Sequence, residues 1–310
     1  MSRLRLALAS TLVAAACHSA PPPAPAAASA SGPISAEAAR QKLKAISPNE
    51  KQLWVVVHIR ANKTQKPDGS VDEAKLFADA LANADAVVQG GGDMIVLINS
   101  RTEMPLYERV IAAVREKYPE FPLGISALDY GPKNLTEGFR LAQQFKAQMV
   151  WCETVPDERM EFEEDDGRYT PAEVIPLDLA IQTQRALRPE AIHAAGVHMK
   201  YTRPLDGKTF EQAMSAALGK VDAINITGPK TAVLADVERV RTARRIAGSY
   251  PMGLASGVSV ENIAEVVEFI DYAIVGTSLK MDQDPLRTDV AKVRTLREKM
   301  TTLSRAAKAP

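Results

Sequence analysis

The stretch DAINITGPKTAVLADVERVRTARRIAGSYPMGLAS, residues 222–256, contains a short apolar run, a helical segment and a second short apolar run. Both apolar runs are short and mainly aliphatic, as expected for strands that are buried on both faces of a parallel sheet. The segment between them, 237–247, has apolar residues at the spacing of an amphipathic helix. A strand, a helix and another strand in this order predict a βαβ unit with parallel strands.

The same alternation of apolar runs and helical stretches continues from residue 53 to residue 303. The runs are LWVVVHI (53–59), DMIVLIN (93–99), FPLGISA (121–127), QMVWCE (148–153), IHAAGVHMK (192–200), DAINIT (222–227), PMGLAS (251–256) and YAIVG (272–276). The helical stretches that follow them are 71–88, 107–118, 135–145, 171–187, 210–218, 237–247, 260–269 and 290–303. A short helical pattern at 34–43 precedes the first run, and we expect helix N-caps at Thr209, Ser259 and Asp289.

Eight strand–helix repeats predict one α/β domain, a single (β/α)₈ TIM barrel over residues 34–310. An open doubly wound sheet is the alternative, but such sheets seldom need eight strict repeats. No G-x-G-x-x-G motif follows the first strand, and Gly90-Gly91-Gly92 before the second strand is typical of a helix-terminating turn. We therefore expect a closed barrel, and no cofactor is indicated.

The composition argues against nucleic acid as a partner. The 310-residue chain has 38 basic and 38 acidic residues, and only 5% of its residues are aromatic. Nucleic-acid binders normally have a basic excess or a basic face, and single strands need aromatic stacking platforms. The two cysteines are Cys17 and Cys152, so the barrel has one thiol, which we expect to be a buried strand residue. One thiol gives no disulfide within the barrel and no cysteine cluster for a metal.

The N-terminus has the pattern of a targeting segment. Arg3 and Arg5 precede an apolar stretch at 6–16 that is too short to span a bilayer, and small residues precede Cys17. LVAAACHS (12–19) resembles a bacterial lipoprotein signal, so residues 1–17 predict export and lipidation of Cys17. An ordinary signal peptide cut near the same place is the alternative. The Pro-, Ala- and Ser-rich segment 18–33 predicts an extended tether between a bacterial membrane and the barrel, outside the cytoplasm.

Polar residues at the carboxyl ends of the strands are the candidate site, because active sites of this fold lie there. Alternation along the first strand predicts that His58 points into the barrel, and we expect His198 and Lys200 on one face of the fifth strand. Lys200 is a candidate nucleophile, proton carrier or phosphate partner, although a solvated lysine is as consistent with the sequence. His198 and His58 are candidate acids or bases, or simply hydrogen-bonded residues. The remaining polar residues at these ends are Arg60, Asn99, Asp129, Glu153 (a candidate base or metal ligand), Asn225 and Thr227.

The last two strands end in small residues that predict a phosphate site. Strand seven ends in Ser256-Gly257 before a predicted helix, and strand eight ends in Gly276-Thr277-Ser278, with Lys280 nearby. Barrels commonly bind phosphate at these two loops, where small residues let backbone N–H groups approach the anion. The alternative is that the glycines only make tight turns. The acidic run 161–166 after strand four favours a solvated lid over the site. A metal role is the alternative, although the spacing matches no calcium loop.

Several stretches together match a recognisable set of motifs. They are VDAINITGPKT (221–231), PMGLASGVSVENIAEVV (251–267), DYAIVGTSLK (271–280) and RTDVAKVRTL (287–296). They resemble the BtpA/SgcQ family, whose members typically read D-x-x-I-x-T-G, V-x-x-G-S-G-V-x-x-E-N-I and D-G-x-I-V-G-[TS]-S-L-K. GVHMKYTRPL (196–205) is similar to the family's H-x-K stretch. Here Ala255 stands where the family usually has Gly, and Asp271-Tyr272 replaces the usual Asp-Gly.

The resemblance implies a phosphate-binding barrel of the ribulose-phosphate-binding type and a link to membrane protein biogenesis. Carried over by position, the residues that would line the anion site are Thr227, Gly228, Ser256, Gly257, Gly276, Thr277, Ser278 and Lys280, with Lys200 nearby. The first hypothesis is therefore a lipid-anchored barrel that binds a small phosphorylated or anionic ligand and acts as a lyase or isomerase. The alternative is a non-catalytic, membrane-associated assembly factor with a membrane-protein partner. A metal-dependent hydrolase is disfavoured, since no H-x-H pair follows strand one.

Overall fold

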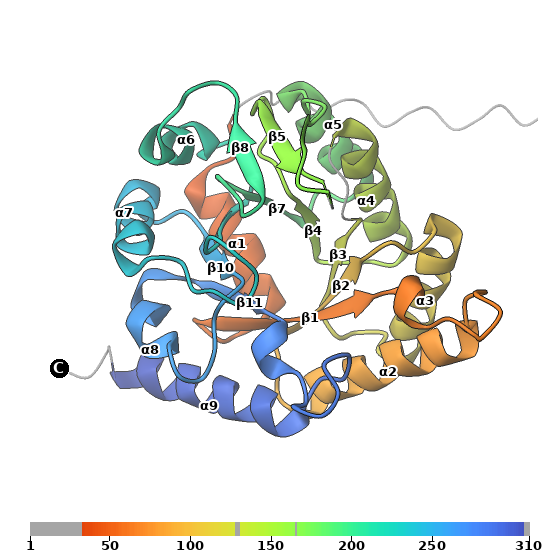
Figure 1. The fold of residues 1–310 in the computed structure, drawn as a ribbon. Helices are drawn as coiled ribbons and strands as arrows, with labels where there is room; N and C mark the ends of the chain where they lie inside the picture. The colour runs from red at the N-terminus through yellow and green to blue at the C-terminus, as the bar shows by residue number, and fades with distance from the viewer. Residues whose placement is uncertain (1–32, 128–130, 165, 307–310) are drawn as a thin grey trace, which may run out of the picture. The chain divides into compact units, whose positions relative to one another are not determined.

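Parallel strands close into a barrel in the computed structural model, which describes residues 33–127, 131–164 and 166–306. Figure 1 looks toward the carboxyl ends of the strands, with the helices around them. Going round, the strands are β1 (Gln52–Ile59), β2 (Met94–Asn99), β3 (Leu123–Ser126), β4 (Met149–Cys152), β7 (Ile192–Gly196), β9 (Ala223–Ile226), β10 (Met252–Ala255) and β11 (Tyr272–Val275). β11 pairs with β1, with Gln52 opposite Tyr272, and this pairing closes the ring. The predicted (β/α)₈ barrel is confirmed.

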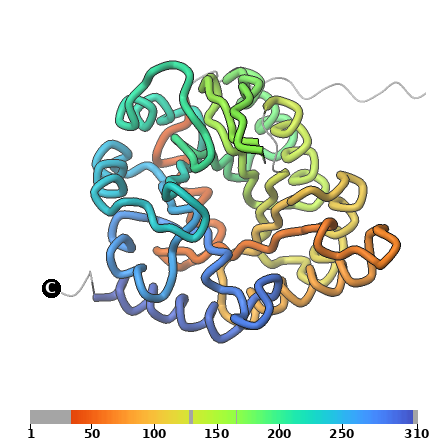
Figure 2. Tube along the Cα trace, in the orientation of Figure 1, coloured from red at the N-terminus to blue at the C-terminus, as the bar shows by residue number. Residues whose placement is uncertain are grey.

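The helices lie outside the strands, and α2 packs beside α9 where the ring closes (Figure 2). The helices are α1 (Ala36–Ile46), α2 (Glu73–Gln89), α3 (Met104–Lys117), α4 (Pro132–Gln144), α5 (Leu177–Leu187), α6 (Phe210–Ala217), α7 (Val237–Ala247), α8 (Ile263–Val266) and α9 (Val290–Ala306). Short 3₁₀ turns follow β1, α8 and β11 at Ala61–Lys63 (η1), Val267–Phe269 (η2) and Thr277–Leu279 (η3).

Two of the three predicted helix N-caps are confirmed. Thr209 forms a capping box with Gln212, and the Asp289 carboxylate accepts a hydrogen bond from the backbone N–H of Ala291 in the first turn of α9. Ser259 is not an N-cap, because α8 begins only at Ile263. The backbone N–H of Ser259 instead donates to Asn262 Oδ1, at 2.8 Å, and this bond holds the preceding residues in a turn.

Two segments differ from their sequence-based predictions. The fifth barrel strand, β7, ends at Gly196 rather than Lys200, because His198 adopts a φ of +45° and turns the chain out of the barrel. The acidic segment begins as a strand, β5 (Met160–Glu163), and is not a simple loop. β5 pairs antiparallel with β6 (Tyr169–Pro171) and β8 (Thr202–Pro204), so a small sheet stands beside the barrel mouth (Figure 1).

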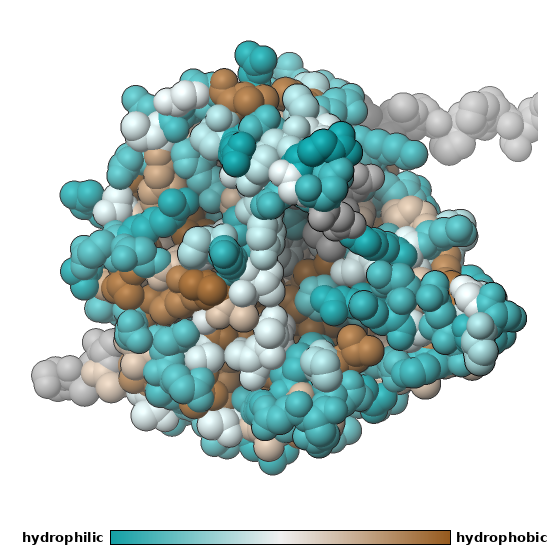
Figure 3. Space-filling model, in the orientation of Figure 1, coloured by the Kyte–Doolittle hydropathy of each residue, from teal (hydrophilic) through white to brown (hydrophobic). Residues whose placement is uncertain are grey.

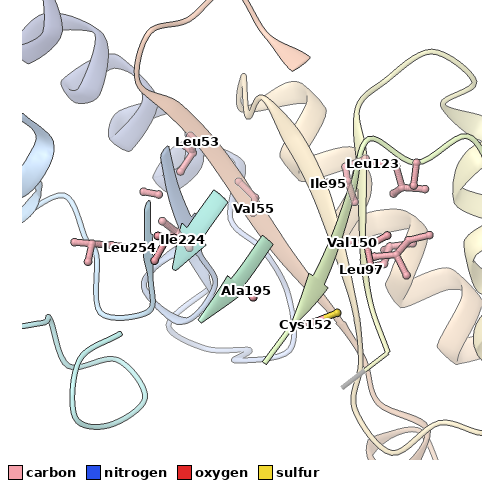
Figure 4. Packing of buried hydrophobic residues seen from close by; sticks show 14 of the residues in the cluster. Leu53, Val55, Ile95, Leu97, Leu123, Val150, Cys152, Ala195, Ile224 and Leu254 are labelled. Carbon is pink, nitrogen blue, oxygen red and sulfur yellow. The ribbon is translucent and has the colours of Figure 1, made fainter. Parts of the chain in front are cut away.

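Side chains alternate between the two faces of the barrel wall, as the strand patterns predict. On β1, Leu53, Val55 and Val57 pack between strands and helices, whereas Trp54 and Val56 belong to a separate cluster inside the barrel. Figure 4 shows helix-facing residues of the outer cluster on several strands. At the amino end of the barrel, Leu43 and Ile46 of α1 join the inner cluster, so α1 covers this end.

Tyr272, at a position for which the resemblance implies a glycine, fills the barrel interior. Its ring stacks on Trp54 with the centroids 3.9 Å apart, and its hydroxyl donates to Asn225 Oδ1 at 2.7 Å. Gly253 on the neighbouring strand makes this possible, because a Cβ there would lie 2.2 Å from Cε2 of Tyr272. The centre of the barrel is therefore a packed core.

A reciprocal hydrogen-bond pair recurs at the amino end of the barrel. Four times, the residue just before a strand donates its backbone N–H to a carbonyl on the preceding strand, at 2.8 to 2.9 Å. Its side chain accepts the backbone N–H of that same partner residue, at 2.6 to 2.9 Å. The pairs are Asp93 with Leu53, Gln148 with Leu123, Asp222 with His193, and Asp271 with Met252. Each pair fixes the register of two neighbouring strands near their amino ends.

The three aspartates of these pairs also hold helices against the barrel. Asp93 accepts from Nη1 of Arg297 on α9 at 2.7 Å, and Asp271 accepts from Nη2 of Arg244 on α7 at 2.7 Å. Asp222 forms an ion pair with Lys42 of α1, with Nζ and Oδ1 2.8 Å apart. All three aspartates are buried, and each of these buried charges needs the cation that pairs with it.

We expect Asp93→Ala to destabilise the protein by about 3 to 5 kcal/mol, because it leaves Arg297 and the Leu53 N–H without their buried partner. Urea unfolding followed by circular dichroism measures this. Asp282→Ala is the matched control, since Asp282 is an exposed aspartate that pairs with Lys292, and its loss should cost about 1 kcal/mol or less. Equal losses in the two variants would show that the reciprocal pair has no special importance.

Candidate functional site

A cavity of about 290 Å³ opens at the carboxyl ends of β10 and β11, at the mouth of the barrel. We call it the mouth cavity. Five of the residues predicted for an anion site line it, together with His58, Trp151 and Lys200; the five are Ser256, Gly257, Gly276, Thr277 and Ser278. The face that contains the mouth is largely hydrophilic at its rim, and residues of intermediate hydropathy cross its centre (Figure 3). Loops distant in sequence thus meet at one opening, as this fold predicts.

The backbone after β10 is strained. Ser256 has a φ of +107° and Gly257 a φ of +78°, and a non-glycine residue in such a conformation costs about 1 to 3 kcal/mol. Only glycine fits at position 257, because a Cβ there would lie 2.2 Å from the carbonyl carbon of Val233, in the loop after β9. The Ser256 hydroxyl accepts a hydrogen bond from the backbone N–H of Ala232 in the same loop, at 3.3 Å. The loops after β9 and β10 therefore pack directly on each other at the edge of the cavity.

Lys200 reaches from beyond β7 to the edge of the mouth cavity. Its Nζ lies 3.4 Å from the hydroxyl of Ser256 and 3.2 Å from that of Thr231. Its backbone N–H donates to Thr227 Oγ1 at 2.8 Å, and this bond fixes where the side chain starts. Burial lowers the pKa of Lys200, while the nearby charge of Glu153 acts in the opposite direction. The amine is thus next to the strained loop and is easier to deprotonate than a surface lysine.

Glu153 follows β4 and lies outside the mouth cavity, in a small separate cavity that it lines together with Trp151. Its carboxyl group interacts electrostatically with Lys200. Burial raises the pKa of Glu153 to about 7, and the charge of Lys200 limits the rise. A carboxyl group with this pKa is partly protonated at neutral pH, so it can both donate and accept a proton. Perturbed carboxyl groups of this kind are concentrated at functional sites.

His58 points into the barrel mouth, as alternation along β1 predicts, and it lines the mouth cavity. Burial lowers its pKa to about 3, and the charges of Arg60, Lys280 and Lys200 add to the effect. The imidazole is therefore neutral at physiological pH and can serve as a hydrogen-bond partner for a ligand. The same three cations make the surroundings of His58 favourable for an anion.

His198 and Lys200 do not share a face of a strand, so the prediction that they do is wrong. The positive φ of His198 sends its imidazole toward Phe210 of α6, with the ring centroids 6.1 Å apart. Beyond β7, His198 lines a different cavity of about 590 Å³, together with Arg239, Thr227 and Gly228. Lys200 borders this cavity as well as the mouth cavity.

Thr227, Gly228 and Lys280 lie outside the mouth cavity, although the resemblance implied an anion-site position for them. Thr227 is buried and accepts the backbone N–H of Lys200. A Cβ at Gly228 would lie 2.0 Å from the carbonyl oxygen of Val233, so this glycine permits loop packing. Lys280 lines a neighbouring cavity of about 300 Å³. Asp129 and Cys17 lie outside the described residues.

Two residues at the mouth were not identified from the sequence as part of the site. Thr231 ends the segment GPKT (228–231) in the loop after β9, and only this place just beyond a strand could have indicated it. Its hydroxyl contacts Lys200. Trp151 is an inward-pointing residue of β4 that lines the cavity, and its Nε1 is buried with no hydrogen-bond partner. A buried N–H without a partner is costly and is often satisfied by a ligand or water.

Within residues 33–127, 131–164 and 166–306, no group of three or more His, Cys, Asp or Glu side chains is placed to hold a metal ion. In the same ranges, no helix has the length and apolar character that crossing a bilayer requires.

Solved structures with the same fold have little sequence in common with this chain. Thiamine phosphate pyrophosphorylase from Pyrococcus furiosus is 14% identical, with a TM-score of 0.51, over 82% of this chain and 98% of the other. Phosphoribosylanthranilate isomerase from Thermotoga maritima is 11% identical, with a TM-score of 0.51, over 81% and 99%. Tryptophan synthase from M. tuberculosis is 12% identical, with a TM-score of 0.50, over 87% and 96%. At these identities the likeness supports the fold alone.

No curated protein matches the chain by sequence. The family model for BtpA matches residues 49–302, which include all the barrel strands described above and the loops that line the mouth cavity. This range covers most of the chain and contains the motifs on which the resemblance was based. The chain belongs to the BtpA family.

Proposed function

We propose that the barrel binds a small phosphorylated ligand, with the phosphate at the loops after β10 and β11. The observation that carries the proposal is the mouth cavity, in which Ser256, Gly257 and the turn at Gly276–Ser278 surround one space beside the amine of Lys200. Small residues allow backbone N–H groups to approach phosphate oxygens, and a lysine supplies a point charge. The α8 helix has only four residues, so its dipole contributes little to anion binding.

The charges around the mouth support an anionic ligand. Arg60, Lys200 and Lys280 each lower the pKa of His58, so all three cations act on the same point at the barrel mouth. Glu153 is the nearby acid, and burial keeps it partly protonated. Two of the solved structures with this fold have names that include a phosphorylated compound, thiamine phosphate and phosphoribosyl anthranilate, which fits the proposal.

Lys200 and Glu153 supply the chemistry of an isomerase or lyase in this proposal. A ligand anchored by its phosphate at β10 and β11 extends toward the centre of the mouth, where His58 and Trp151 line the cavity. Glu153 has a pKa near neutrality and could exchange a proton with a ligand that reaches past Trp151, the residue that lines both the mouth cavity and the small cavity of Glu153. Lys200 can stabilise the negative charge that develops on the carbonyl oxygen.

We expect inorganic phosphate to bind the full-length protein and to lose at least about tenfold in affinity in Gly276→Trp, because an indole would occupy the mouth cavity. Isothermal titration calorimetry measures the dissociation constant. Ser215→Trp on the exposed face of α6 is the control and should bind like wild type. Equal binding by Gly276→Trp and wild type, both folded by circular dichroism, would remove the proposed site.

Glu153→Gln should change the pH dependence of stability. Between about pH 4.3, the usual pKa of an unfolded Glu, and about pH 7, folded Glu153 holds a proton that the unfolded chain has lost. Wild type therefore loses stability as pH rises through this window, by at most about 1.4 kcal/mol per pH unit, and the glutamine variant avoids this loss. Urea unfolding from pH 5 to pH 8 measures the difference. Glu298→Gln, at an exposed position on α9, is the control. A constant difference between Glu153→Gln and wild type would contradict the raised pKa.

We also propose that the protein is exported and anchored through a lipid on Cys17. In a bacterial host, the Cys17→Ser variant should be absent from the membrane fraction. Mass spectrometry should find no lipid on its N-terminal peptide. Cys152→Ser is the control and should stay in the membrane fraction, because Cys152 is buried in β4. An unmodified wild-type N-terminus at another residue would favour the ordinary signal peptide.

A further inference from the structure

A second cavity, of about 300 Å³, adjoins the mouth cavity beside α2. We call it the side cavity. His58, Arg60, Thr231 and Thr277 line both cavities, so the two spaces meet at these residues. The outer wall of the side cavity comes from α2 and from Pro285 and Leu286, in the segment between η3 and α9. One ligand of moderate size could therefore occupy both spaces.

Lys280 and Arg60 face the side cavity without an ion-pair partner among the described residues, although the charge of Asp284 acts on Lys280. Lys63 is a third cation of the lining, at an exposed position. The ammonium group of Lys280 donates to Thr288 Oγ1 at 2.9 Å, and Arg60 is half-buried. Within the parts of the chain that the structure describes, neither side chain forms an ion pair. Asp79, the acid in this wall, is already paired with Lys75 at 2.5 Å and with Arg287 at 3.0 Å. Burying cations without counter-ions is costly, and an anionic group between them would remove much of this cost.

The rest of the side cavity is mainly apolar. Its walls include Leu76 and Ala80 of α2 and Leu286, and Asn83 is fully engaged with backbone groups of Asp79, Leu286 and Thr288. A hydrocarbon or ring fits such walls, whereas a bare inorganic ion would leave them in contact with water. The two cations are therefore placed for an anionic group that is carried on an apolar stem.

We propose that the side cavity is a second subsite, in which Arg60 and Lys280 hold a carboxylate of the same ligand whose phosphate lies at β10 and β11. The inference rests on the proposed function and narrows the substrate class to phosphorylated organic acids with an apolar linker. The guanidinium of Arg60 can take both oxygens of a carboxylate, and the ammonium of Lys280 adds a third contact. Lys280 thus belongs to a carboxylate subsite and not to the phosphate site that the family motif implied for it.

The test uses two series of synthetic probes with the full-length protein. One series consists of ω-phosphonocarboxylic acids of increasing chain length, and the other of alkylphosphonates of the same lengths, which lack the carboxylate. Calorimetry gives the dissociation constant for each probe. At the length that spans the two subsites, the carboxylate should improve affinity by about tenfold or more, the scale of a charge-assisted hydrogen bond.

Lys280→Met and Arg60→Gln should each lose this advantage, so that each variant binds the phosphonocarboxylate and the alkylphosphonate of that length with equal affinity. Lys66→Met removes a lysine at an exposed position outside both cavities and should keep the advantage. If wild type binds both series equally at every length, or if Lys280→Met keeps the preference, the carboxylate subsite is wrong and the phosphate site stands. If no alkylphosphonate binds wild type but a carboxylate advantage remains, the phosphate site is wrong. If no probe of either series binds, both proposals fail.

Discussion

The reciprocal hydrogen bonds at the amino end of the barrel are the constraint on which the rest of the structure depends. A closed sheet has no free edge. A one-residue slip in the register of a strand would therefore move its side chains between the helix-facing layer and the lumen of the barrel. In this barrel the residue just before a strand makes two hydrogen bonds to one residue of the neighbouring strand. Its backbone N–H donates to the carbonyl of that residue, and its side chain accepts the backbone N–H of the same residue. Arg297, Arg244 and Lys42 then connect the same carboxylates to α9, α7 and α1. Strand register and helix docking are therefore set by the same few buried groups.

A rigid amino end permits strain at the opposite end. Ser256 holds a positive φ that a serine rarely adopts, and Gly257 lies against the carbonyl of Val233. Such conformations persist only where the surrounding structure over-determines them, and here the strands below and the loop after β9 do so. The hydroxyl of Ser256 thereby lies near both Lys200 and the mouth cavity.

Local patterns predicted most of the scaffold and part of the site. The apolar runs gave the strands, alternation along β1 gave the inward direction of His58, and the strand-end rule gave Ser256 and Gly276. The position of His198 could not be predicted, because a positive φ at a non-glycine residue has no local signal. The side cavity was equally inaccessible, since it depends on how residues 281–289 pack against α2. The features that could not be predicted depend on tertiary contacts between segments far apart in the chain.

The stacked pair of Tyr272 and Trp54 has an evolutionary consequence. Gly253 must stay bare while Tyr272 occupies the lumen, because even a methyl group would overlap the phenol ring. A relative with a glycine at the position of Tyr272 is free of this restriction and can accommodate a larger residue at the position of Gly253. Substitutions at positions 253 and 272 should therefore be correlated among relatives. A larger residue on one strand should accompany a smaller residue on the adjacent strand, so that the total side-chain volume in the lumen stays nearly constant.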